Sequence, residues 1–465
     1  MSSPVRKFRE AMESLLIAGG LALVIRGFVL EAFVVPTGSM APAIYGRNLS
    51  ITCPECDHQF AIKWGWGPSR RPEIKKCPRC GKPIQPTYFA FSRGDRLLVN
   101  KFLHRMRGLS RWEIVVFWCP DPSIRKNYIK RLVGLPGEEV QVKDGDLFVN
   151  GEIERKPREV QETMWVSLSD DDFGGKLWAK SWELESGQCD IGSGVLTLLG
   201  PGGERAEMCL KYSRPIDDLI VYNAGNDQNN GNGYPPEEVD IEGARSSYGG
   251  NPVGDIKVEV ETVIADGAAI VIDLTDNRRP GGTPGDAALR FIIRSGPGVS
   301  TISNAVGKKI WWNKLNLTAG PHVIECANVD AALHLVVDGE PKVTHAYEPV
   351  PEISRPAPSV GVGAMGGRVD LTRLALYRDV HYCSINSAFT RTYGVDSPYH
   401  LSERTRDPET GEMIGENEYF FLGDNSRSSR DCRMLDLADY PIVEKYIRGK
   451  ALVRFWPPRR IGLIE

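Results

Sequence analysis

The sequence of 465 residues has little of several features that would point directly to a function. Its 57 lysines and arginines nearly balance its 60 aspartates and glutamates, so no excess charge suggests nucleic acid as a partner. Ten cysteines are too few for a scaffold built on disulfides. None of the seven histidines stands in a motif typical of an imidazole base, which disfavours a histidine-based hydrolase. Beyond the N-terminal segment, no apolar stretch approaches the roughly 20 residues of a membrane span, which excludes a polytopic membrane protein.

Turn-forming residues, by contrast, are abundant. The chain has 48 glycines and 32 prolines, which predict many turns and more strand than helix. The expected fold class is therefore mostly β. The length suggests several domains, at a typical size of about 150 residues each.

The N-terminal segment combines a basic start with an apolar stretch. Basic residues occupy positions 6, 7 and 9, and residues 14–25 carry no charge. That stretch alone is too short to cross a bilayer, but residues 12–33 suffice if Arg26 reaches the far interface. We predict a cytoplasmic N-terminus over 1–11 and a transmembrane anchor over 12–33, because the basic residues precede the apolar segment. A cleaved secretory signal and a buried soluble helix are the alternatives.

The first candidate motif is the loop over residues 33–46, which contains Pro-Thr-Gly-Ser. Pro36 and Pro42 fix backbone angles on either side of a Gly-Ser pair. Gly38 allows conformations closed to other residues, so Ser39 can be presented on a tight turn. The loop directly follows the apolar segment, which would put Ser39 close to the membrane surface. Taken alone, a plain surface turn is the alternative.

The second motif is a predicted strand over residues 127–138 that ends in a Pro-Gly turn. Side chains alternate along a strand, so Tyr128, Lys130 and Leu132 share one face. Burial of a lysine disfavours its charged form and lowers its pKa. A neutral lysine can then act as a general base. The alternative is a solvated lysine on an edge strand.

The third motif lies within residues 418–433. A short apolar strand runs into the turn Gly423-Asp424-Asn425. The polar stretch beyond it contains three serines and offers an Asp431–Arg433 ion pair. The alternative is a surface loop whose exposed ion pair contributes little to stability.

In this order, the three motifs resemble bacterial type I signal peptidase, a peptidase family of the leader-peptidase type with a Ser-Lys dyad. The resemblance covers about residues 10–49, 86–150 and 415–465. It implies a single-pass protein of the cytoplasmic (inner) membrane with a mostly β catalytic domain on the extracytoplasmic side. It further implies removal of signal peptides from exported preproteins after small residues, in an Ala-x-Ala-like pattern, with no cofactor for catalysis.

The resemblance also assigns roles to single residues. Ser39 would be the nucleophile and Lys130 the general base, a variant of the usual serine–base pairing. Thr37 would complete an oxyanion hole with the backbone N–H of Ser39. Ser429 would orient the Lys130 amine.

Further roles are structural or concern the substrate. Asp431 and Arg433 would hold the site in place. The walls of shallow pockets for alanine-sized side chains would include Phe33, Val35, Ile44 and Ile129. Two departures from the family pattern occur, over 111–113 and over 426–429. The second leaves Ser426 or Ser428 as alternatives for orienting the lysine.

Four cysteines form a separate motif, two C-x2-C pairs that are 20 residues apart: Cys53, Cys56, Cys77 and Cys80. This spacing is typical of a zinc ribbon, in which two knuckles supply tetrahedral thiolate ligands. We predict a structural zinc site in an insert over 50–85. Two disulfides are the alternative if this region lies outside the cytoplasm. A nucleic-acid partner is not expected beside a secretory protease.

Strand signals dominate the long region between the second and third motifs. Residues 256–263 alternate apolar and polar side chains, and Asp338-Gly339 marks a hairpin turn. Regular strands without helical stretches predict a β-sandwich insert over 175–382, similar to laminin-G or concanavalin-like jelly rolls. This insert would be a spacer, or would bind carbohydrate or a protein partner. The catalytic domain would then lie in three parts, over 34–49, 86–165 and 383–465.

The prediction as a whole is a membrane-anchored serine endopeptidase of the signal peptidase I type with two inserts. The alternative is a membrane-tethered, lectin-like binding protein on an inactive peptidase scaffold. The presence of both Ser39 and Lys130 argues against this alternative.

Overall fold

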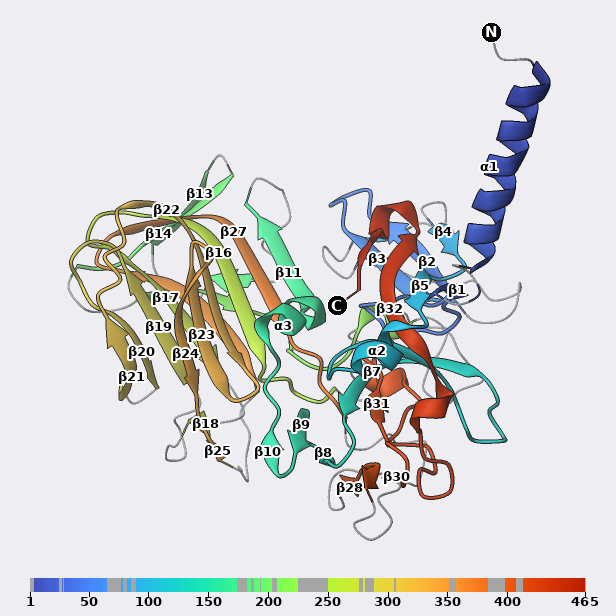
Figure 1. Ribbon diagram of the computed structural model, residues 1–465. Helices are drawn as coiled ribbons and strands as arrows, with labels where there is room; N and C mark the ends of the chain where they lie inside the picture. The colour runs from blue at the N-terminus through green and yellow to red at the C-terminus, as the bar shows by residue number, and fades with distance from the viewer. Residues whose placement is uncertain are drawn as a thin grey trace.

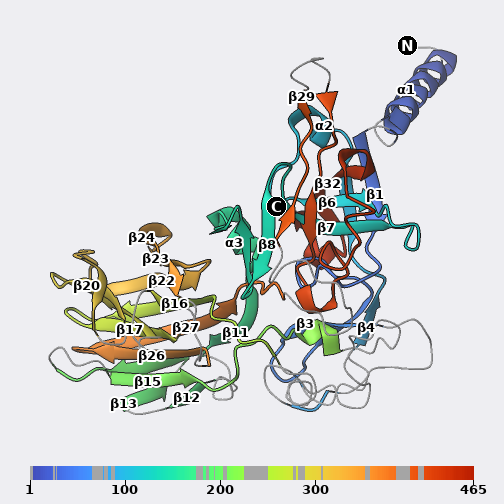
Figure 2. The same cartoon turned by 90° about the horizontal axis from the view of Figure 1, so that it is seen from below.

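The computed structural model describes residues 4–24, 27, 29–64, 77, 82–84, 89–173, 182–184, 188–192, 194–202, 207–224, 250–275, 279–280, 288–304, 307–350, 357–383, 398–406 and 413–464. Over these residues the protein is mostly β, as predicted, and its helices are α1 (Pro4–Val24), α2 (Leu103–Arg107) and α3 (Arg158–Met164). Two β bodies lie side by side, and α1 extends away from one of them (Figures 1 and 2).

The N-terminal helix differs from the predicted anchor. It begins at Pro4, and i,i+4 ion pairs such as Arg6–Glu10 line its first half. It ends at Val24, and strand β1 (Leu30–Val34) pairs with β5 (Arg96–Asn100). The prediction of one helix over 12–33 is therefore wrong at its C-terminal end, because residues 30–34 join a sheet. Within the described ranges, none of the helices is both long and apolar enough to cross a membrane.

The body next to α1 is built on one antiparallel sheet. Its strand order is β1, β5, β32 (Ile447–Trp456), β6 (Ile114–Trp118), β7 (Asn127–Gly134) and β31 (Phe420–Leu422), with β33 (Gly462–Leu463) pairing β32. The sheet joins segments from the start, the first third and the end of the chain. It thereby brings the three sequence motifs to one place.

Small sheets flank this catalytic sheet. One has the order β10 (Glu152–Ile153), β9 (Asp146–Val149), β8 (Glu139–Lys143) and β28 (Tyr399–His400). Another has the order β3 (Gln59–Lys63), β2 (Asn48–Thr52) and β4 (Phe89–Ser92). Two further pairs are β29 (Thr405–Arg406) with β30 (Met413–Ile414) and, in the other body, β18 (Arg279–Pro280) with β25 (Pro349–Val350) (Figure 1).

The second body consists of two antiparallel sheets. The first has the order β13 (Gln188–Gly192), β14 (Val195–Leu199), β27 (Arg368–Arg378), β16 (Ile256–Ile264), β22 (Gly320–Val329), β23 (Ala332–Val337) and β24 (Glu340–Ala346), with β11 (Val166–Asp172) on β27. The second has the order β12 (Trp182–Leu184), β15 (Glu207–Tyr212), β26 (Ser359–Met365), β17 (Ala269–Thr275), β19 (Ala288–Arg294), β20 (Ser300–Asn304) and β21 (Lys309–Asn313).

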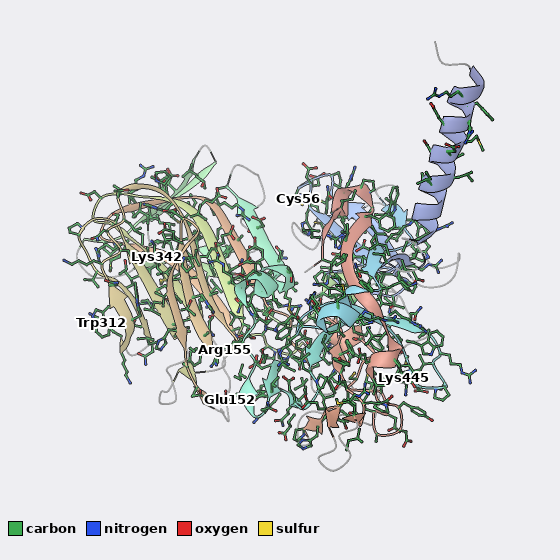
Figure 3. All side chains as sticks on the ribbon, viewed as in Figure 1. Cys56, Glu152, Arg155, Trp312, Lys342 and Lys445 are labelled. Atoms are coloured by element: carbon green, nitrogen blue, oxygen red, sulfur yellow. The ribbon has the colours of Figure 1, made fainter. Side chains whose placement is uncertain are left out.

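The two sheets share one hydrophobic core, to which β16 contributes Val258 and Val260 and β17 contributes Ile270 and Ile272. Alternate residues of each strand point into that core, as in a β-sandwich. The sandwich already includes β11, so it begins before the predicted boundary at residue 175. Trp312, which is exposed, lies at its edge far from the catalytic sheet (Figure 3).

Candidate active site

The loop that carries Ser39 follows β1 directly. Its backbone is held by a hydrogen bond from the Val35 N–H to the Asp95 carbonyl, 2.9 Å, and by one from the Ile44 N–H to the Met40 carbonyl, 2.8 Å. The side chains of Val35, Met40 and Ile44 are buried against the catalytic sheet. Ser39 itself is half-buried. The loop therefore presents the serine from a backbone fixed at both ends.

Lys130 lies on β7, where it pairs with Val115 of β6. Its Nζ is 2.5 Å from Ser39 Oγ and 3.2 Å from the carbonyl oxygen of Ile129. The lysine side chain is buried, and burial lowers the pKa of Lys130 to about 8, although the carboxylates of Asp431 and Asp424 act in the opposite direction. An amine with this pKa is partly neutral near pH 7, so it can accept a proton from the hydroxyl beside it.

A second set of contacts surrounds Asp431. Its carboxylate accepts hydrogen bonds from the Ser429 hydroxyl, 2.6 Å, and from the Gly423 N–H, 2.9 Å. Arg433 binds both carboxylate oxygens, with Nε 2.8 Å from Oδ1 and Nη2 2.7 Å from Oδ2. Burial raises the pKa of Asp431, but the Arg433 guanidinium and these hydrogen bonds outweigh it, so the pKa of Asp431 is lowered. Asp431 is therefore ionised and fixed in orientation.

The serines predicted to orient the lysine lie differently from the expectation. The Ser429 hydroxyl donates to Asp431, and among the described residues no hydrogen bond joins it to Lys130. Ser426 Oγ accepts hydrogen bonds from Arg433 Nη1, 2.5 Å, and from the Cys383 N–H, 2.7 Å. Both serines therefore contribute to the Asp431–Arg433 network, and among the described residues neither forms a hydrogen bond with the amine.

The ion pair between Arg131 and Asp424 was not predicted from the sequence. Both side chains are fully buried, with Nε 2.9 Å from Oδ1 and Nη2 2.8 Å from Oδ2. Arg131 follows Lys130 in β7, and Asp424 lies in the turn after β31, so the pair fastens the third motif to the second. Arg131 lies in the second motif and Asp424 in the third, so the sequence did place both residues near the candidate site.

Asn425, next in that turn, binds the nucleophile loop. Its backbone N–H donates to the Ser39 carbonyl, 3.0 Å, and its side-chain amide donates to the Gly38 carbonyl, 2.9 Å. The Asn425 amide also pairs with Asn223, which lies in a short 3-10 helix, η4 (Val221–Ala224), of the long insert. No sequence pattern marks Asn223 as part of this site.

The other predicted site residues divide into two groups. The four predicted pocket residues gather in one hydrophobic cluster with Met40: Phe33, Val35, Ile44 and Ile129. Thr37, predicted for the oxyanion hole, is exposed one residue before Gly38.

The cysteine motif lies beside β2 and β3. The sulfur atoms of Cys53, Cys56 and Cys77 lie within 4.8 Å of one another, and Cys80 falls outside the described residues. Cys53 begins a tight turn in which the Asp57 N–H donates to its carbonyl, 2.9 Å. Figure 3 labels Cys56 beside the catalytic body. Three converging thiols fit a tetrahedral thiolate site for zinc, and Cys80 of the same motif is the candidate fourth ligand.

Comparison with known proteins points to one family. The family model described as signal peptidase, peptidase S26, matches residues 76–189, a range that includes Lys130 but begins after Ser39. Signal peptidase I V of Bacillus subtilis is 46% identical over 77 residues, which are 17% of this chain and 42% of that protein. A probable signal peptidase I-2 of Synechocystis is 30% identical over 156 residues, 33% and 50% of the two chains. Signal peptidase I of Rickettsia bellii is 30% identical over 160 residues, 34% and 44%. The chain thus spans half or less of the length of these relatives.

Solved structures give much weaker matches. The carbohydrate recognition domain of Emp47p aligns with 49% of this chain over its whole length, at a TM-score of 0.29 and 10% identity. A Bacillus subtilis protein of unknown function with a galectin-like fold aligns with 47% of this chain over its whole length, at a TM-score of 0.30 and 11% identity. Scores this low carry no argument about the inserts. The family model and the curated relatives, however, support a relationship of this chain to the signal peptidase family, peptidase S26, and with it a peptidase of the hydrolase class.

Proposed function

We propose that the protein is a signal peptidase I-type serine endopeptidase that cleaves signal peptides from exported preproteins. The observation that carries the proposal is the distance of 2.5 Å between Ser39 Oγ and the buried Nζ of Lys130, whose pKa is lowered to about 8. A desolvated, partly neutral amine can accept the proton of the hydroxyl beside it, which makes that hydroxyl an activated nucleophile.

The proposed reaction is acyl transfer in two steps. Neutral Lys130 accepts the Ser39 hydroxyl proton while Ser39 Oγ attacks the scissile carbonyl carbon, forming a tetrahedral intermediate. The intermediate collapses to an acyl-enzyme as the C–N bond breaks and Lys130 returns the proton to the leaving amine. Water, deprotonated by Lys130, then attacks the acyl carbon. The ester bond to Ser39 Oγ breaks, the new carboxyl group leaves with the signal peptide, and Lys130 returns the proton to Ser39 Oγ. The Ser39 backbone N–H and the Thr37 hydroxyl would stabilise the oxyanion.

Substrate selection is proposed to follow from the apolar cluster beside the dyad. Phe33, Val35, Ile44 and Ile129 pack in one cluster with only Phe33 and Ile129 partly exposed. An apolar surface of this kind is expected to favour small apolar side chains, such as that of alanine, over charged ones. Cleavage after an Ala-x-Ala-like sequence is the corresponding expectation.

Membrane attachment is proposed through α1. Leu15, Leu16 and Ile17 are each more than 60% exposed on a helix that extends away from the catalytic body (Figure 1). Such a surface is expected to be covered by lipid. The proposed location is the extracytoplasmic face of the inner membrane, with the N-terminus inside.

The inserts are given structural roles. We assign a structural zinc to Cys53, Cys56 and Cys77 with Cys80 as the fourth ligand. Metal analysis of the purified protein tests this assignment, and paired cystines without zinc would overturn it. The sandwich is proposed as a spacer, and binding of carbohydrate or a protein partner to it is the other outcome of a glycan array or pull-down. The lectin-like, catalytically inactive alternative is not favoured, because nucleophile and base lie in hydrogen-bond contact.

Cleavage of a model preprotein by purified full-length enzyme tests the function. Ser39→Ala and Lys130→Ala are each expected to reduce kcat/KM by at least about 1000-fold, as in other enzymes whose nucleophile and base act together. Lys126→Ala, exposed just before β7, is a matched control for Lys130→Ala that should retain activity. Equal cleavage by the wild type and Ser39→Ala would overturn the proposal.

A further inference from the structure

The segment over residues 213–224, here called the arm, connects the sandwich with the nucleophile loop. It follows β15, and its Ile216 is buried in the core of the sandwich. Leu219 is buried in a different core, together with Cys53 and Cys77 of the cysteine motif. Helix η4 at the end of the arm packs beside β3, where Figure 2 shows it as a short green segment. The arm therefore joins the core of the sandwich to the core beside the cysteine motif within nine residues, counted from Ile216 to Ala224.

Tyr222 of the arm lies directly on the nucleophile loop. A Cβ added to Gly38 would be 1.9 Å from Tyr222 Cε1, so the ring occupies the space that a side chain at position 38 would need. The ring stacks on Tyr45, with centroids 5.2 Å apart, and its hydroxyl donates to the Arg47 carbonyl, 3.0 Å. Tyr222 is 3% exposed. The ring thus contacts the backbone before Ser39 and the loop's later residues.

Asn223 acts on the same loop through one intermediary. Its amide and that of Asn425 exchange two hydrogen bonds, of 2.7 and 2.9 Å, and both side chains are buried. One Asn425 amide proton goes to Asn223 and the other to the Gly38 carbonyl, 2.9 Å. Asn223 therefore fixes the rotation of the Asn425 amide, because a rotated amide would lose its partners on both sides.

The peptide group between Gly38 and Ser39 links this contact to catalysis. A trans peptide is planar, so the direction of the Gly38 carbonyl determines the direction of the Ser39 N–H. That N–H is the backbone donor of the proposed oxyanion hole. A hydrogen bond to the carbonyl also polarises the peptide and strengthens its N–H as a donor. The direction and strength of the donor therefore depend on the contact between Asn425 and Gly38.

We propose that Asn223 and Tyr222 are positioning residues of the peptidase site, supplied by the insert, which orient the Ser39 N–H toward the oxyanion. This inference rests on the proposed function. It makes the arm a part of the catalytic apparatus rather than a connection between strands of the sandwich. Neither residue touches the reacting atoms.

The expected effect is partial because the Gly38 carbonyl has a second donor, the Ala41 N–H at 3.0 Å. Complete loss of an oxyanion-hole donor costs about 100- to 1000-fold in kcat. Loss of Asn223 leaves the donor in place but less well oriented, so Asn223→Ala should lower kcat about tenfold or more. The KM for the preprotein should change less than about twofold, since ground-state contacts are retained.

The experiment measures kcat and KM of full-length Asn223→Ala, together with its thermal midpoint. The matched control is Asn328→Ala, which removes a buried asparagine of the sandwich whose Oδ1 accepts a hydrogen bond from Tyr347, 2.8 Å. The control should lower the thermal midpoint but leave kcat of the folded enzyme unchanged. A normal kcat for Asn223→Ala, or an equal loss of kcat in Asn328→Ala, would overturn the inference.

A double-mutant cycle separates positioning from general destabilisation. If Asn223 acts through Asn425, then Asn223→Ala has no further effect on kcat in an Asn425→Ala background. An undiminished effect in that background would contradict the inference. Tyr222→Ala, which removes the ring from Gly38, should also lower kcat, and an unchanged kcat would contradict the role given to Tyr222.

The outcomes also distinguish this inference from the proposed function. If Ser39→Ala still cleaves the preprotein, the function fails. If Ser39→Ala is inactive while Asn223→Ala is fully active, the function stands and the positioning role fails.

Discussion

Titration of Lys130 gives the most direct test of the dyad, because burial of the amine determines the direction of the effect and a pKa of about 8 sets the pH range in which it is expected. Burial lowers the pKa of this lysine from 10.5 to about 8. That difference corresponds to a destabilisation of the ammonium, relative to the neutral amine, of roughly 3 kcal/mol. At pH 7 about one-tenth of the enzyme then carries the neutral base, and at pH 9 about nine-tenths does.

The assay is kcat/KM for a model preprotein between pH 6 and 10.5 at constant ionic strength. We expect a rise of about tenfold from pH 7 to pH 9 and a plateau above it, since kcat/KM reports the free enzyme's essential base. A lysine with an ordinary pKa would instead give a continuous rise to about pH 10. A profile without a plateau by pH 9.5 would refute the buried, neutral base.

Unfolding must be separated from titration in this experiment. Between about pH 8 and 10.5 the unfolded chain binds more protons at Lys130 than the folded chain, so this group's contribution to stability rises with pH. Loss of structure at alkaline pH would therefore come from other groups. Circular dichroism at each pH is the control for it.

Three further predictions concern single side chains. Lys130→Met should abolish cleavage without lowering the thermal midpoint, because a buried amine is replaced by an apolar chain of similar length; a large drop in the midpoint would contradict this. Asp424→Asn should cost about 3–5 kcal/mol in chemical denaturation, since its buried guanidinium partner keeps its charge; a loss below about 1 kcal/mol would argue against the pair's burial. Gly38→Ala should impair cleavage because its Cβ meets Tyr222, whereas Gly202→Ala, where a Cβ meets nothing within 4 Å, should be neutral; full activity of Gly38→Ala would refute the close contact.

Much of the β architecture was predictable because it follows from local patterns. The alternation over 256–263 corresponds to β16, whose buried side chains face the sandwich core. The Asp338-Gly339 turn joins β23 to β24, and both residues have positive φ, 52° and 79°, as a type I′ hairpin turn requires. In both cases the signal lies within a few residues of the element that it specifies.

The N-terminal segment shows where a local pattern is insufficient. Residues 30–34 are as apolar as the preceding helix, and composition alone could not separate the two. Their assignment depends on β5, whose backbone groups offer a complete antiparallel ladder from Leu30–Asn100 to Val34–Arg96. A partner some 60 residues away decides the structure, which is the usual reason why tertiary context overrides propensity.

Some residues around Ser39 are likewise predictable from a local sequence pattern, and others are not. Ser39 and Lys130 could be proposed from the sequence because each stands in a motif with a recognisable neighbourhood. Asn223 could not, since it is separated from Asn425 by 202 positions and an amide pair leaves no periodicity or charge pattern. The sequence placed Ser429 near the dyad, but in the structure its hydroxyl donates to Asp431 and not to Lys130.

The low pKa of Lys130 depends on charges that do not touch it. Two buried carboxylates, Asp424 and Asp431, act to raise that pKa, and each is paired with an arginine, Arg131 or Arg433. Because each guanidinium offsets its partner's negative charge, the carboxylates do not outweigh the burial of the amine. Both ion pairs thus leave desolvation as the dominant influence on the base, and the Arg131–Asp424 pair also fastens the third motif to β7.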